Sequence, residues 1–155
     1  MSDFTDLDDA PHPDSLIVLV VGSHLRAEIA DRPLASRLRD LILAWQSQSD
    51  SLAPLFPIIC TDLWYLNAPE LMARPTIALG DPSVNAAVAY LSPHLPTAFV
   101  VDQSFRIHLD PEFIEPRACF WGINHAATAS AMQTFASRYL DSFLRTIHNL
   151  SSASN

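Results

Sequence analysis

The chain contains no lysine, and all nine of its basic residues are arginine. A Schiff base requires a lysine amine, and the phosphate loop of P-loop NTPases requires its lysine. Seventeen acidic residues against nine basic ones give a net charge of −8. Affinity for nucleic acid comes mainly from clustered Lys and Arg. The composition therefore excludes Schiff-base and P-loop chemistry and argues against a nucleic-acid partner.

Apolar runs of membrane-spanning length are also missing, because none approaches the ~20 residues that a spanning helix needs. The first residues lack the basic and apolar segments of a signal peptide. We therefore expect a cytoplasmic protein without a membrane partner. Only two cysteines occur, Cys60 and Cys119, both in apolar runs. Two buried thiols are the expectation, although the sequence leaves open whether they pair.

The known catalytic and cofactor signatures are absent as well. No Gly-x-Gly-x-x-Gly opens a helix, and no Gly-x-Ser-x-Gly, Cys-x-x-Cys or His-Glu-x-x-His occurs. The sequence thus names no cofactor and no metal, and it supplies no complete catalytic constellation.

Glycine is scarce, and each of the three glycines follows a short apolar run. Gly22 follows residues 16–21, Gly80 follows residues 76–79, and Gly122 follows residues 118–121. Glycine permits tight or positive-φ backbone where a strand turns into a helix. In parallel α/β sheets such turns line the carboxyl edge, where ligands usually bind. The three glycines therefore predict both the fold class and its functional edge.

The 155 residues fit one domain. Residues 1–14 hold five aspartates and two prolines and are expected to form a disordered acidic tail. We predict a single α/β domain over residues 15–149 and a second disordered tail over residues 150–155. The predicted strands cover 16–21, 56–60, 75–79, 97–101, 105–109 and 117–121.

Helix predictions rest on caps and on apolar periodicity. Asp31 is a candidate N-cap for a helix that ends near residue 46, with Pro33 in its first turn. Asp81 followed by Pro82 predicts the start of the next helix, and Asn124 predicts the start of a final helix that runs to about residue 148. The segment 63–74 is ambiguous, with a short helical turn at residues 69–73.

The resulting order, β-α-β-β-α-β-β-β-α, implies right-handed parallel crossovers. Residues 105–109 alternate apolar and polar side chains, which indicates a hairpin arm with one wet face. The fold class is therefore α/β: a three-layer, Rossmann-like or flavodoxin-like, mostly parallel sheet with one antiparallel β-hairpin.

Polar and glycine residues in the turns after the strands form the candidate ligand-binding set. These are Gly22, Ser23, His24, Arg26, Asp62, Gly80, Asp81, Asn85, Gly122, Asn124 and His125. Asp62, Asp81 and His125 are the candidate catalytic residues, because carboxylates and imidazole carry out acid–base chemistry. Each also has a purely structural explanation. Asp81 and Asn124 are typical helix caps, and Asp62 can close a turn.

Two functions of different classes are compatible with this set. The first is a binding or assembly module without catalysis, which holds a small anionic ligand or a protein partner at the carboxyl edge. Its basis is the helix N-termini that present unpaired N–H groups there, with Arg26 as the nearest cation. The alternative is a small hydrolase or transferase that uses Asp62 and Asp81 with His24 or His125. The histidine would act either as a base or as a metal ligand, and in the second case the enzyme is metal-dependent.

Overall fold

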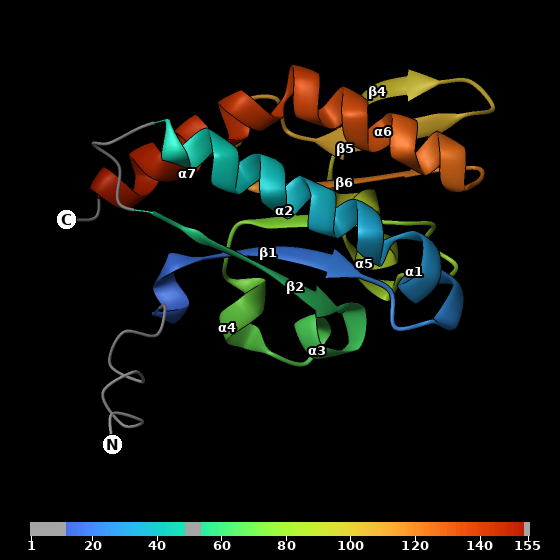
Figure 1. Ribbon diagram of the computed structural model, residues 1–155, viewed down its shortest axis with the longest axis horizontal. Coiled ribbons are helices and arrows are strands. Elements are labelled where there is room, and N and C mark those ends of the chain that lie inside the picture. Colours follow the sequence, from blue (N-terminus) through green and yellow to red (C-terminus); the bar gives the residue numbers. More distant parts are fainter. Residues whose placement is uncertain (1–11, 49–53, 154–155) are drawn as a thin grey trace.

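The computed structural model describes residues 12–48 and 54–153. Most of the tail predicted over residues 1–14, and the end of the tail predicted over residues 150–155, lie outside the described residues. Within them the chain forms an α/β fold: six strands in one mixed sheet, with helices packed on it (Figure 1).

The strands follow the order β2-β1-β3-β6-β5-β4. Their bounds are β1 Leu16–Val21, β2 Phe56–Thr61, β3 Thr76–Leu79, β4 Thr97–Val101, β5 Phe105–Leu109 and β6 Arg117–Gly122. The pairs β2–β1, β1–β3 and β3–β6 are parallel. The pairs β6–β5 and β5–β4 are antiparallel. A mostly parallel sheet with an antiparallel hairpin is the arrangement that the strand order predicted.

Helices cover both faces of the sheet (Figure 1). Their bounds are α1 Leu25–Ala30, α2 Arg32–Ser47, α3 Asp62–Leu66, α4 Pro69–Met72, α5 Ala86–Leu91, α6 His125–Arg138 and α7 Leu140–Ala153, and short 3-10 turns occupy Pro13–Ser15 and Ser92–His94. Helices α2, α6 and α7 lie on one face, while α3, α4 and α5 lie on the other. The molecule thus has three layers.

Two apolar clusters fill the spaces between the layers. Alternate residues of β1 separate into them: Ile17, Leu19 and Val21 join the cluster under α2, α6 and α7, and Val18 and Val20 join the cluster under α3 to α5. This division explains why the strand is apolar throughout, since both of its faces are covered. Cys60 and Cys119 lie in the second cluster as free, buried thiols, as expected.

The helix after β3 begins four residues later than the Asp-Pro pair predicts. Its first residue is Ala86, and its N-cap is Asn85, whose Oδ1 accepts hydrogen bonds from the amides of Ala87 and Val88. Asp81 instead closes a turn, because its Oδ1 accepts from the Ser83 amide and hydroxyl. The prediction that Asp81 caps this helix is therefore wrong. An Asx turn satisfied the same side chain before helical backbone began.

Two further helix predictions need correction. The single helix predicted from residue 124 to about residue 148 is two helices, and the break falls at Tyr139, where φ and ψ are −125° and −24°. Neither glycine nor proline marks this break. Asp31 does precede α2, but its side chain makes no capping hydrogen bond, because α1 ends at the same residue and Asp31 keeps helical backbone angles.

Candidate functional site

The connections after β1 and β3 diverge at the carboxyl edge of the sheet. From β1 the chain passes through α1 to α2 on one face, and from β3 it passes to α5 on the opposite face. The neighbouring β6 leads into α6, on the same face as α2. Parallel α/β sheets open a crevice where adjacent strands connect in opposite directions. The topology therefore places a crevice beside β3.

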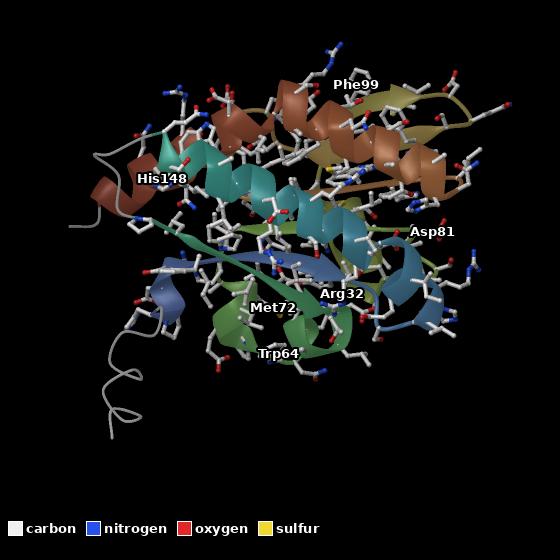
Figure 2. All side chains as sticks on the ribbon, viewed as in Figure 1. Arg32, Trp64, Met72, Asp81, Phe99 and His148 are labelled. Atoms are coloured by element: carbon white, nitrogen blue, oxygen red, sulfur yellow. The ribbon has the colours of Figure 1, made fainter. Side chains whose placement is uncertain are left out.

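A cleft of ≈ 340 Å³ occupies this position. Its polar lining comes from α1, the α1–α2 junction, the turn after β3 and the start of α6, and it includes Arg26, Asp31, Asp81, Asn124, His125 and Thr128. Ile29, Val84 and Ile123 supply apolar walls. Figure 2 labels Asp81 at this end of the molecule, near α1 and the first turn of α6.

Asp31 is the least expected residue of the cleft. It is only 6 % exposed, yet no described residue donates a hydrogen bond to its carboxyl group or forms an ion pair with it. Arg32, next in the chain, pairs with Glu28 instead. Burial raises the pKa of the Asp31 carboxyl to about 6; the charge of His125 lowers this pKa and that of Asp81 raises it. Carboxylates of residues this little exposed usually have hydrogen-bond partners, whereas the Asp31 oxygens are not fully enclosed and Asp31 lines the cleft.

The start of α6 contributes hydrogen-bond donors to the same cleft. Asn124 is the N-cap, as predicted, and its Oδ1 accepts from the Ala127 amide at 2.8 Å. The amides of His125 and Ala126 donate to no described group. Such first-turn amides, together with the helix dipole, attract negative charge. Both Asn124 and His125 are exposed.

Asp62 has a structural role and is not among the residues that line the cleft. Its Oδ1 accepts from the amides of Ser23 at 3.0 Å and Leu63 at 2.8 Å, and its Oδ2 accepts from the Ala86 amide at 2.7 Å. The side chain is 3 % exposed. One carboxylate thus holds the turn after β1 and the first turns of α3 and α5 together, and its oxygens are already engaged.

Asn85 is also a structural residue. It is fully buried, and its Nδ2 donates to the carbonyl oxygens of Val20 and Leu79 while its Oδ1 caps α5. Ser23 and His24 are not among the residues that line the cleft. Ser23 donates its amide to Asp62, and His24 caps α1 by accepting from the Arg26 amide at 3.1 Å.

The glycines allow close approach around the cleft. Gly80 has φ +118°, and a Cβ there would lie 2.5 Å from Asp31 Oδ2. A Cβ on Gly22 would overlap the Val84 carbonyl, and one on Gly122 would overlap the Ala127 backbone in the first turn of α6. Gly122 also lines the cleft and donates its amide to Thr128 Oγ1 at 3.0 Å.

A second hollow of ≈ 280 Å³ continues from the cleft along the tip of the β4–β5 hairpin. It shares Asp81, Gly122 and Ile123 with the cleft. Trp121 and Arg106 border it, with the Arg106 guanidinium 5.8 Å from the centre of the Trp121 ring. The two hollows are therefore neighbours that share part of their walls.

The structure thus gathers five of the predicted binding residues around the cleft: Arg26, Asp81, Gly122, Asn124 and His125. Of the four residues whose convergence the enzyme hypothesis requires, it brings together Asp81 and His125 but not His24 or Asp62. The sequence did not identify Asp31, because its burial depends on the approach of the α1–α2 junction to Gly80 in the turn after β3. The nearest sequence signal was an aspartate before a proline-containing first turn, which resembles an ordinary cap.

Within the described residues, no group of three or more His, Cys, Asp or Glu side chains is placed to hold a metal ion. No described helix is both long and apolar enough to cross a bilayer. Comparisons with profiles of protein families, with curated proteins and with solved structures found no significant match.

Proposed function

We propose that this α/β domain is a binding module that holds a small ligand in the cleft at the carboxyl edge of its sheet. The observation that carries the proposal is Asp31, a residue only 6 % exposed that lines the cleft and whose carboxyl group accepts no hydrogen bond from a described residue. A carboxylate that is largely removed from water and has no hydrogen-bond partner costs free energy. A ligand that donates a hydrogen bond to it offsets that cost.

Three other features support a small ligand. The cleft lies where α/β folds usually bind ligands, and its volume of ≈ 340 Å³ falls in the range of small-molecule sites. Its lining combines apolar walls with a few converging polar groups, a pattern typical of such sites. The free amides of α6 and the Arg26 side chain favour a negatively charged group on the ligand.

The alternative, a hydrolase or transferase, loses Asp62 as a reacting group because its oxygens accept three backbone hydrogen bonds. Asp81 and His125 remain in the cleft. In the screen below, conversion of a bound compound into a product would support this alternative over simple binding.

The proposal is tested by screening a library of small polar molecules for an increase in thermal stability. The cleft-filling variant Ala30→Phe places a ring at the end of α1, where Ala30 lines the cleft. Ala44→Phe, on an exposed position of α2, is the matched control. We expect compounds that stabilise the wild type and the control but not Ala30→Phe.

Far-UV circular dichroism establishes that both variants are folded before they are compared. The binding proposal is overturned if no compound stabilises the wild type, or if those that do stabilise Ala30→Phe equally well.

A further inference from the structure

The cleft carries charges of both signs that are not paired with one another or with other described residues. Asp31 and Asp81 form no ion pair, and neither does Arg26. Asp31 lies at the end of α1, and Asp81 lies in the turn after β3. Arg26 on α1 and the first turn of α6, with Asn124 and His125, line the same cleft. The cleft lining therefore combines an acidic part, the carboxyls of Asp31 and Asp81, with a basic part, Arg26 and the first turn of α6, and no ion pair is formed between these described residues.

The two carboxylates of the acidic part attract a positively charged group. The carboxyls of Asp31 and Asp81 are close enough to act on each other electrostatically. One oxygen of Asp81 is engaged by Ser83, whereas the Asp31 carboxyl has no donor among the described residues. An ammonium group has three N–H donors and a compact positive charge, and it satisfies two neighbouring carboxylates together.

The N–H donors and the positive charge of the basic part attract a carboxylate or a similar anion. Two amides of α6, those of His125 and Ala126, are free. The positive end of a 14-residue helix dipole favours an anion at that position. Arg26 adds a guanidinium, whose fork of donors fits a carboxylate.

We propose that the ligand of this cleft is a small zwitterion of the amino-acid kind, with its ammonium group between Asp31 and Asp81 and its carboxylate at the first turn of α6 near Arg26. This inference rests on the proposed binding function and specifies its ligand class. The apolar walls of Ile29, Val84 and Ile123 accommodate the carbon skeleton between the two charges.

Other groups around Asp31 set the pH range of binding. His125 on α6 lowers the pKa of Asp31 and Asp81 raises it, while burial brings it to about 6. Arg26 on α1 shares the cleft, and Arg32 on α2 is paired with Glu28. Because an ammonium group binds the ionised carboxylate, affinity falls as pH drops through this value.

The test is calorimetric titration with α-amino acids and with ω-amino acids of increasing length, from β-alanine onward. Matched single-charge probes are propylamine and propionate. We expect at least one zwitterion to bind, with both single-charge probes weaker by about tenfold or more, because each lacks one charge-assisted contact. Affinity should be higher at about pH 7.5 than at about pH 5.

Asp31→Asn should weaken binding of that zwitterion by about tenfold or more. Asp40→Asn, at an exposed position of the neighbouring α2, should leave it unchanged. The inference is overturned if propylamine or propionate binds as tightly as the zwitterion, or if Asp31→Asn binds it as the wild type does.

The two proposals fail differently. If library compounds bind in the cleft but no zwitterion does, the ligand class is wrong and the binding function stands. If neither library compounds nor zwitterions bind, both proposals are wrong.

Discussion

Asp31 shows how one side chain relates stability to function in this protein. The carboxyl is buried against Gly80, whose missing side chain leaves room for it, and no described donor stabilises its charge. Residues that lower the stability of the folded protein and make no compensating structural contact tend to lie at functional sites. This cost makes the role of Asp31 measurable without knowledge of the ligand.

Replacing Asp31 by asparagine should stabilise the free protein at neutral pH. The pKa of Asp31 is raised from 3.8 to about 6, so the folded state holds this proton more tightly than the unfolded chain does. Its contribution to stability is present below about pH 4 and is lost as pH rises through about 6. We expect Asp31→Asn to gain on the order of 2 kcal/mol at about pH 7.5 and almost nothing at about pH 4.

Urea denaturation of the wild type and Asp31→Asn across this pH range measures the difference. A variant that is less stable than the wild type at neutral pH would mean that the Asp31 carboxylate has a stabilising partner in the folded protein, contrary to this prediction.

Gly80 and Gly122 should resist substitution far more than Asp102 does. Alanine at Gly80 must adopt φ +118° and approach Asp31, and alanine at Gly122 must displace the first turn of α6. We expect each to lower the free energy of unfolding by at least about 2 kcal/mol. Asp102→Ala, at an exposed turn position, should stay within about 0.5 kcal/mol. Chemical denaturation of the three variants gives the comparison, and a harmless Gly122→Ala would refute the close approach at that turn.

At the scale of the elements, Asp62 joins the ends of three of them. Its carboxylate accepts amide hydrogen bonds from the turn after β1 and from the first turns of α3 and α5. These turns are part of the same carboxyl edge as the cleft. Asp62 therefore supports the site indirectly, by fixing the turn from which α1 begins.

Asp62→Asn should destabilise the protein by about 2 kcal/mol, because an amide group has only one acceptor oxygen and presents N–H donors to backbone N–H groups. Asp81→Asn should be nearly neutral, since asparagine keeps the acceptor for the Ser83 amide and hydroxyl. Thermal unfolding of the two variants at one pH tests the contrast. Equal stability of both variants would mean that the Asp62 carboxylate does not hold these three turns together.

The elements also show what the sequence can and cannot reveal. Strands β1 and β4 and the hairpin arm β5 were predicted with their exact bounds, because apolar runs and alternation depend on local residues. The start of α5 was not predicted correctly, because the Asp81-Pro82 pair fits an N-cap as well as Asn85 does. Asn85 is the cap in the structure, where its side chain also donates buried hydrogen bonds to the carbonyl oxygens of Val20 and Leu79. The cleft edge was predictable from the glycine turns. Asp31 was not, because its burial depends on a contact with Gly80, which is distant in the sequence.

At the scale of the whole molecule, helix α7 closes the larger of the two apolar clusters. Phe143 is fully buried there, and its ring lies 5.3 Å from that of Phe113 and 6.3 Å from that of Phe135. On the surface, Asp141 accepts from Trp45 Nε1 at 2.9 Å, which connects α7 to α2. The last helix therefore belongs to the cooperative unit that also contains α2 and α6.

This position of α7 predicts a large effect from a residue far from the cleft. Phe143→Ala removes a fully buried ring and leaves a cavity between α6, α7 and the segment before β6, and should cost about 3–5 kcal/mol. Phe56→Ala is the matched control, because Phe56 is 40 % exposed on the edge strand β2, and its cost should be about 1 kcal/mol or less. Denaturation followed by both near-UV and far-UV circular dichroism measures the two costs and the coincidence of the transitions. If Phe143→Ala lost little stability, or if α7 melted in a separate step, α7 would be an appendage to the domain and not one of its layers.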